Sequence, residues 1–360
     1  MSDRGRERRG MVVVMVVAAL AAFAAVVAGI VLLVAGDATS ARPAPRITAA
    51  TGATTSTPPT TVGSAPPTSA TVSTPSPGAP YPVGRATTTV VDATRGTAAR
   101  GPTPESATRS LSVRIRYPST VEGDDAPPAL GTFPLVVFAH GFGIAAADYD
   151  AFTRDLAAEG FVVVAPDFPR SSSVFPGPPT ADDIDEQARD VGFLIDAFAP
   201  TAAGAAVDAP GGTWTGHVAP GSAGVVGQSD GGNTAARVGG NSCCRSPRVV
   251  AVVSLAGDEG RSGGAWGVEG QAPLLLINGT ADTVNPWSFS QRLYDDARSP
   301  RLLVAIDGAG HLEPYTSGPQ RPAVVALAAA FLHGYLGRPA ALAEVAGLAS
   351  RDGLSVVASS

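Results

Sequence analysis

Short, continuously apolar runs alternate along this chain with segments of helical periodicity, and this alternation limits the folds open to it. We expect strands at 134–139, 160–165, 223–226, 249–255, 274–277 and 302–306, and helices at 145–160, 182–198, 232–237, 286–298 and 321–335. Strands that are apolar throughout lie in parallel sheets with helices on both faces. The sequence therefore predicts an α/β fold with a mostly parallel central sheet, preceded by a hairpin of strands at 87–93 and 111–117.

The pentapeptide Gly227-Gln228-Ser229-Asp230-Gly231 joins the apolar run at 223–226 to the next expected helix. A Ser between two glycines at a strand-to-helix turn is typical of a nucleophile elbow, because the tight turn leaves no room for neighbouring Cβ atoms. The helix would direct its free N-terminal N–H groups at the Ser oxygen. A second match to the pattern, around Ser262, follows no apolar run, and we expect a loop there.

Polar side chains follow other expected strands at their carboxyl ends, where parallel sheets gather functional groups. Asp282 follows the strand at 274–277, and His311 follows the strand at 302–306. A histidine can take the hydroxyl proton of Ser229 during attack, and a carboxylate on its other ring nitrogen fixes the tautomer. We expect Asp282 to be this carboxylate, with Asp258 as the alternative.

An oxyanion that develops on a substrate needs two fixed N–H donors. The sequence predicts the backbone N–H groups of Asp230 and Phe142, with Gly143 as the alternative to Phe142. The Asp230 side chain would place a negative charge beside the oxyanion, which should weaken catalysis unless the side chain points away. His140, at the start of the same loop, is expected to make a structural hydrogen bond.

The motifs at these strand ends resemble those of α/β-hydrolase serine esterases and lipases. They are the segments 139–143, 227–232, 278–282 and 308–311, and the segment 243–252 is similar to one in relatives grouped with platelet-activating-factor acetylhydrolase, chlorophyllase and bacterial polyester hydrolases. The resemblance covers about 86–338. It implies an α/β-hydrolase fold with Ser229 as nucleophile, Asp282 as acid and His311 as base. Many family members carry His where this chain has Gln228, and a small or apolar residue where it has Asp230.

The predicted function is hydrolysis of carboxylic esters through an acyl-enzyme, on a small-molecule, lipid or polymer ester. Acyl transfer by the same residues, or a non-catalytic binding module, are the alternatives. Phe168, Trp287 and Tyr315 are candidates for lining an acyl pocket. No cofactor or metal is expected, since the four His are scattered. The net charge of −6, with no Lys in the chain, excludes a basic face for nucleic acid.

The N-terminal quarter differs in composition from the rest. Residues 1–10 are basic, and 11–35 are apolar over a length that exceeds the bilayer core, which predicts a transmembrane signal anchor with the following domain outside the cytoplasm. A cleaved signal peptide, giving a secreted protein, is the alternative. Residues 36–85 are rich in Thr, Ser, Pro and Ala and predict a disordered linker. The hydrolase domain is expected at 86–338 and a tail with at most a terminal helix at 339–360. Cys243 and Cys244 are either a disulfide between neighbours or two free thiols.

Overall fold

The computed structural model describes residues 80–200, 208–209, 212–214, 216–258 and 263–360. All of them belong to one compact unit, Ser69–Ser360. The expected membrane span at 11–35 and nearly all of the expected linker lie outside the described residues, as does Ser262. Among the residues that are described, no helix combines the length and the apolar character needed to cross a bilayer.

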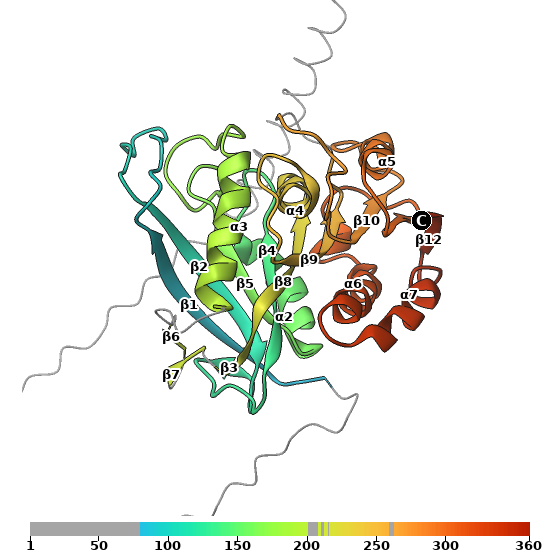
Figure 1. Cartoon of the computed structure of the whole chain (residues 1–360), viewed down its shortest axis with the longest axis horizontal. Coiled ribbons are helices and arrows are strands. Elements are labelled where there is room, and N and C mark those ends of the chain that lie inside the picture. The colour runs from blue at the N-terminus through green and yellow to red at the C-terminus, as the bar shows by residue number, and fades with distance from the viewer. Residues whose placement is uncertain (1–79, 201–207, 210–211, 215, 259–262) are drawn as a thin grey trace, which may run out of the picture. The chain divides into compact units, whose positions relative to one another are not determined.

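Strands and helices alternate along the described chain, as the apolar pattern predicts (Figure 1). The strands are β1 (Val83–Asp92), β2 (Arg109–Pro118), β3 (Gly123–Asp124), β4 (Phe133–Ala139), β5 (Val162–Asp167), β6 (Asp208–Ala209), β7 (Gly212–Thr213), β8 (Val218–Gln228), β9 (Val249–Leu255), β10 (Leu274–Gly279), β11 (Arg301–Ile306) and β12 (Leu354–Ser359). The α-helices are α2 (Asp150–Ala158), α3 (Ile184–Phe198), α4 (Asp230–Gly240), α5 (Trp287–Asp296), α6 (Arg321–Tyr335) and α7 (Leu342–Leu348). Short 3-10 helices are η1 (Ala146–Tyr149), η2 (Glu313–Tyr315) and η3 (Pro339–Ala341).

Ten strands form one sheet in the order β12-β11-β10-β9-β8-β4-β5-β2-β1-β3. Neighbouring strands from β5 to β11 are parallel, whereas β2 joins β5 and β12 joins β11 in antiparallel pairs. The hairpin expected near the start of the domain is the antiparallel pair β1–β2. The prediction of a mostly parallel central sheet is therefore confirmed, and its antiparallel strands lie at the edges.

Helices cover both faces of the sheet, which explains why the central strands are apolar throughout. In β4, Val136 and Phe138 belong to a core cluster that includes residues of α2, α6 and α7. Leu135 and Val137, which point the other way, belong to a second cluster with residues of α3, α4 and α5. The parallel strands therefore run between two helical layers, and their carboxyl ends reach one edge together.

Both expected domain boundaries need correction. β1 begins at Val83, a few residues before the expected end of the linker at Arg85. Residues 339–360 are not a tail, because α7 packs on α6 and β12 adds an edge strand to the sheet. Leu354, the first residue of β12, is buried in the same core cluster as α6. The sequence indicated at most a terminal helix in this region.

Candidate active site

Ser229 occupies the turn between β8 and α4 in the conformation that a nucleophile elbow requires. Its φ of 57° and ψ of −123° are strained for a residue other than Gly. A Cβ on Gly227 would lie 2.0 Å from the carbonyl oxygen of Gly231, and one on Gly231 would lie 2.0 Å from that of Ala139. Both glycines of the pentapeptide are therefore needed for backbone to pass this close to backbone.

Three side chains from separate strand ends meet at this turn. The His311 Nε2 atom lies 3.0 Å from Ser229 Oγ, and the His311 Nδ1 atom lies 2.7 Å from Asp282 Oδ2. Because a carboxylate only accepts, Nδ1 carries the proton, and Nε2 is left to accept from the Ser229 hydroxyl. The structure thus brings together the three residues that the strand-end pattern predicts, in one hydrogen-bonded line.

The carboxylate of Asp282 is fixed at both oxygens. While Oδ2 faces His311, Oδ1 accepts from the backbone N–H groups of Val284 and Asn285, each at 2.8 Å. The Asn285 side chain in turn donates to the carbonyl of Ala256 at 2.6 Å, so the loop after β10 is tied to the end of β9. Asn285 has a clear part in this site that the sequence did not indicate.

Asp258, the alternative acid, takes no part in this line of hydrogen bonds. Its backbone N–H donates to Asn233 Oδ1 at 2.6 Å, which ties the end of β9 to α4. The partner of the His311 Nδ1 atom is Asp282 alone among the described residues. The structure therefore favours Asp282 over Asp258 as the acid.

Two backbone N–H groups remain as candidates for an oxyanion hole. Asp230 is the first residue of α4, so its N–H has no acceptor within the helix. Gly143 is removed as a candidate, because its N–H already donates to the carbonyl of Ser171 at 2.9 Å. This leaves Phe142, half-buried in the loop after β4, as the second expected donor.

His140 makes the structural hydrogen bonds expected of it. Its Nε2 accepts from the N–H of Phe168 at 3.0 Å, and its Nδ1 lies 2.7 Å from the carbonyl oxygen of Gly141. Burial lowers the pKa of His140, which keeps the ring neutral and able to do both. His140 therefore joins the loop after β4 to the end of β5.

The negatively charged side chain of Asp230 lies in the field of a cation. Burial lowers the pKa of Arg237, two turns along α4, and the carboxylates of Asp185, Asp258 and Asp230 oppose that shift. The guanidinium of Arg237 also donates to Asp185 at 3.1 Å. The charge of Asp230 therefore interacts with a buried cation that the carboxylates of Asp185 and Asp258 share.

Two of the three expected pocket residues are wholly buried. Phe168 packs against His140, with ring centroids 5.0 Å apart, and Tyr315 donates its hydroxyl to the carbonyl of Ile277 at 3.1 Å. Both belong to the core in this structure, so the expectation that they line an acyl pocket is corrected. Trp287, at the first residue of α5, is half-buried and packs against the core cluster on that face.

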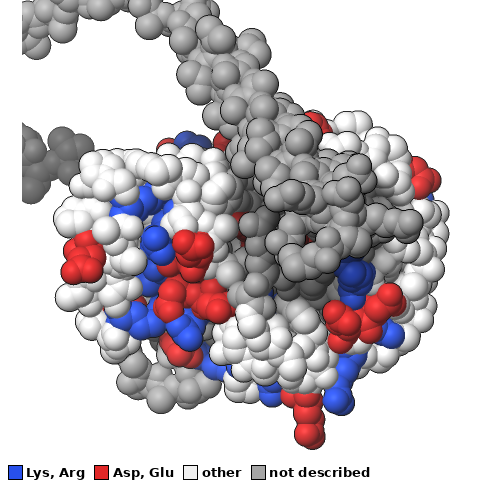
Figure 2. All heavy atoms as spheres, turned by 90° about the horizontal axis from the view of Figure 1, so that it is seen from above, with Lys and Arg blue, Asp and Glu red and all other residues white. Residues whose placement is uncertain are grey.

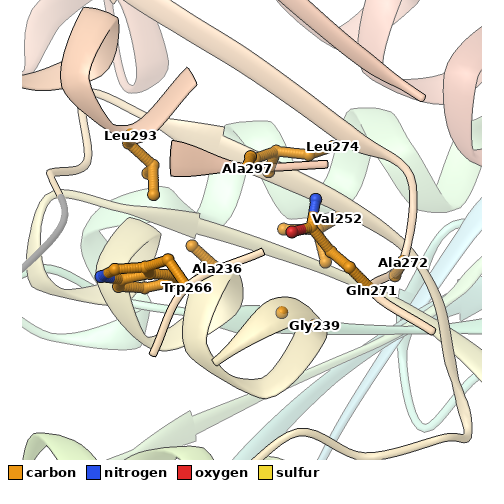
Figure 3. A pocket seen from close by; sticks show the side chains of 10 residues that line it. Ala236, Gly239, Val252, Trp266, Gln271, Ala272, Leu274, Leu293 and Ala297 are labelled. Carbon is orange, nitrogen blue, oxygen red and sulfur yellow. The ribbon is translucent and has the colours of Figure 1, made fainter. Parts of the chain in front are cut away.

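Two hollows lie away from this line of residues. A cavity of about 10 Å³ between α4, β9 and α5, lined by residues such as Ala236, Val252 and Leu293, has room for at most one water molecule (Figure 3). An open hollow of about 520 Å³ on the β1–β2 face is lined by Arg and Asp side chains together. Neither includes Ser229, Asp282 or His311 in its lining.

Charges of both signs are also mixed elsewhere on the surface. Figure 2 shows acidic and basic side chains next to one another on the part of that face that its grey atoms leave open. Such mixing gives this face, where it is described, no basic stripe for a nucleic-acid backbone. The adjacent Cys243 and Cys244, for which the sequence left two possibilities, form a disulfide with each other.

Comparisons with known proteins agree with this fold. The chlorophyllase family matches residues 121–256. The uncharacterized protein YfhR of Escherichia coli (strain K12) is 43% identical over 44 residues, which are 12% of this chain and 16% of that protein, and its counterpart in Salmonella typhi is 39% identical over 44 residues, or 12% and 15%. The chain thus spans only about a sixth of these curated relatives.

Among solved structures, a ferulic acid esterase from Streptomyces cinnamoneus superposes with a TM-score of 0.57 at 21% identity, over 80% of this chain and 99% of that one. At this sequence identity, the structural similarity is evidence for the fold alone. The matched family segment contains β4, β5, the elbow and β9, so it covers the strands that carry the nucleophile. In both comparisons the chain is thus similar to esterase- and lipase-like α/β-hydrolases, and the structural likeness shows that it shares their fold.

Proposed function

We propose that the protein is a serine hydrolase that cleaves carboxylic esters through an acyl-enzyme. The observation that carries the proposal is the line of hydrogen bonds from Ser229 through His311 to Asp282, at 3.0 and 2.7 Å. The chlorophyllase family match and the ferulic acid esterase neighbour support an ester as the substrate. Small-molecule, lipid and polymer esters all fit this proposal.

The reaction follows from the roles of these groups. Ser229 Oγ attacks the ester carbonyl carbon while its proton passes to His311 Nε2, and Asp282 stabilises the resulting imidazolium. The N–H groups of Asp230 and Phe142 would stabilise the oxyanion. When the tetrahedral intermediate collapses, the C–O bond to the alcohol breaks and the alcohol leaves with the proton from His311. Water then repeats the sequence on the acyl-enzyme, which releases the acid and restores Ser229.

The apolar segment at 11–35 supports a membrane-attached, extracytoplasmic location for this activity. Its length and the Arg residues before it are those of a signal anchor with the N-terminus inside, and the Thr- and Pro-rich linker would hold the hydrolase domain away from the bilayer. Accessibility of the domain to an added protease in intact cells tests this location. Protection from the protease until the membrane is broken would contradict it.

Replacement of the nucleophile tests the reaction, and the chain supplies its own matched control. In the full-length protein, purified in detergent, Ser229→Ala should lose hydrolysis of p-nitrophenyl esters and labelling by a fluorophosphonate. Ser262→Ala, at the second match to the same sequence pattern, should retain both. Hydrolysis by Ser229→Ala at the wild-type rate would contradict the proposal. A panel of acyl chain lengths then separates short-ester, lipid and polymer substrates.

A further inference from the structure

Gln228, directly before the nucleophile, is fully buried and has both ends of its amide hydrogen-bonded. Its Oε1 accepts from the hydroxyl of Tyr149 at 2.6 Å, and its Nε2 donates to the backbone carbonyl of His311 at 2.9 Å. The same nitrogen lies 3.4 Å from the His311 Nε2 atom. A residue that the family resemblance marks as a departure therefore contacts the base directly.

Tyr149 continues these hydrogen bonds to the loop after β4. Its hydroxyl, also fully buried, accepts from the backbone N–H of Gly141 at 3.3 Å while it donates to Gln228. Burial raises the pKa of Tyr149 far above neutral pH, so the hydroxyl keeps its proton. A Cβ on Gly141 would lie 2.9 Å from Gln228 Oε1 and 3.1 Å from the Tyr149 hydroxyl, so the three groups pack closely.

These hydrogen bonds run from the backbone N–H of Gly141 to the backbone carbonyl of His311, and these two backbone groups fix the direction of each bond between them. The N–H of Gly141 can only donate, and the carbonyl of His311 can only accept. The Tyr149 hydroxyl must therefore donate to Gln228, and the amide of Gln228 must turn its NH₂ group toward His311. A flipped amide would place Oε1 against the His311 carbonyl oxygen and leave the Tyr149 hydroxyl facing an NH₂ group.

We propose that Tyr149 and Gln228 are positioning residues that set the base and the oxyanion loop relative to the nucleophile. Gly141 immediately precedes Phe142, the expected oxyanion donor, and Gln228 immediately precedes Ser229. The chain of hydrogen bonds thus joins the loop after β4, the end of β8 and the loop after β11, which must hold their relative positions through the reaction. The inference rests on the proposed function, because it assigns parts in the same site. Neither side chain is expected to contact substrate.

The test is a double-mutant cycle in the full-length protein, with Tyr149→Phe, Gln228→Met and the two together. Each single variant should lower kcat on a p-nitrophenyl ester by about tenfold and change KM less than about twofold, because the substrate contacts are kept. The double variant should also lose about tenfold, since either change already breaks the same chain of hydrogen bonds. Tyr117→Phe and Gln271→Met are the matched controls.

The controls separate positioning from a loss of stability. Tyr117 is likewise fully buried and donates its hydroxyl to a backbone carbonyl, that of Ala126, at 2.7 Å. Gln271 is only half-buried and donates to the carbonyl of Arg298 at 2.9 Å, so it controls for the loss of a glutamine hydrogen bond elsewhere in the fold and not for burial. Tyr117→Phe should lower the unfolding temperature about as much as Tyr149→Phe, and both controls should keep the wild-type kcat.

Three results would overturn the inference. They are single variants within twofold of the wild-type kcat, a double variant that loses the product of the two single losses, and a Tyr117→Phe loss of kcat equal to that of Tyr149→Phe. If the wild type hydrolyses no ester, the proposed substrate class fails by itself, and the cycle is read from the rate at which a fluorophosphonate labels Ser229. A wild type that is neither active nor labelled overturns both proposals.

Discussion

Gly143 donates its backbone N–H to the carbonyl oxygen of Ser171 at 2.9 Å. This hydrogen bond joins the loop after β4, which carries the expected oxyanion donor, to the long connection between β5 and α3. A second one, from the N–H of Ser173 to the carbonyl of Ile144 at 3.3 Å, extends the contact. The segment 169–179 is therefore tied to the loop that carries Phe142, and we expect whatever fixes that segment to affect substrate binding.

Arg100 helps to hold the segment 169–179 in place. It is 5% exposed, and its guanidinium donates to four backbone carbonyls at 2.7 to 3.2 Å, those of Pro169, Ser172, Gly177 and Pro178. Arg100→Met would leave these carbonyls without their donor. We expect the free energy of unfolding to fall by about 3 kcal/mol and KM for esters to rise severalfold, as measured by denaturant titration and steady-state kinetics.

An exposed arginine provides the comparison for this prediction. The side chain of Arg154 is 47% exposed and pairs with Glu122 at the surface. Arg154→Met should therefore change the free energy of unfolding by less than about 1 kcal/mol and leave KM unchanged. Equal effects of the two substitutions would show that the segment 169–179 does not depend on Arg100.

The assignment of the acid can be tested by two substitutions of the same kind. Asp282→Asn keeps the shape of the side chain but removes the charge that stabilises the His311 imidazolium and fixes its tautomer. We expect kcat to fall by about 10³-fold or more. Asp258→Asn, at the alternative position, should stay within a few fold of wild type. A larger loss from Asp258→Asn than from Asp282→Asn would reverse the assignment.

His333 gives the fold a dependence on acid pH. Its ring is stacked on Phe161 with centroids 4.0 Å apart, and its Nε2 lies 2.8 Å from the carbonyl oxygen of Glu159. Burial lowers the pKa of His333 from 6.5 to about 4. The unfolded chain thus binds this proton more readily than the folded one, so the stability that neutral His333 contributes is complete above pH 6.5. It is lost as the pH falls toward 4, by about 3 kcal/mol.

His333→Phe keeps a ring against Phe161 and removes the titrating group. Between pH 7 and pH 4, the free energy of unfolding of the wild type should fall by about 3 kcal/mol more than that of the variant. Denaturant titrations at several pH values measure this difference. His140, whose pKa burial also lowers, is present in both proteins, so its contribution cancels. If the free energy of unfolding fell equally with pH in the wild type and in His333→Phe, His333 would not be the cause of the acid dependence.

Local pattern predicted the elements that form the core and the residues that come together at the strand ends. Apolar runs identified the central strands because these are buried on both faces. Ser229, Asp282 and His311 could be predicted to meet because each follows one of these strands in the sequence. The strained turn at Ser229 could also be predicted from the sequence, since glycines at fixed spacing indicate where backbone must pass close to backbone.

Contacts between distant segments gave no such local signal. Tyr149 and Gln228 are 79 residues apart, and the direction of their hydrogen bond depends on where Gly141 and His311 lie in the fold. Arg100 satisfies carbonyls of a loop about 70 to 80 residues later in the chain. Phe168 and Tyr315 were candidates for lining an acyl pocket, but both are fully buried, because aromatic character alone does not distinguish a pocket wall from a core.

The sequence pattern did not predict β12, and the reason lies in the exposure of its residues. Val356 and Val357 are neighbours in sequence and both exposed, and the register with β11 shifts between Val356 and Ala358, so this strand shows neither a buried apolar run nor an alternation of apolar and polar residues. Yet β12 pairs with β11 along its length, and Asp307, four residues before His311, donates its N–H to the carbonyl of Gly353 at 3.0 Å.

Truncation after Ser350 should therefore leave β11 as an open edge and free the segment that leads to His311. We expect a lower unfolding temperature and a lower kcat, with KM little changed. In case the truncated chain does not fold, Leu354→Ala removes the buried anchor of β12 and should cost about 2 kcal/mol or more, whereas Val357→Ala, at an exposed site, should cost less than about 0.5 kcal/mol. An unchanged unfolding temperature after truncation would mean that these residues are a dispensable tail.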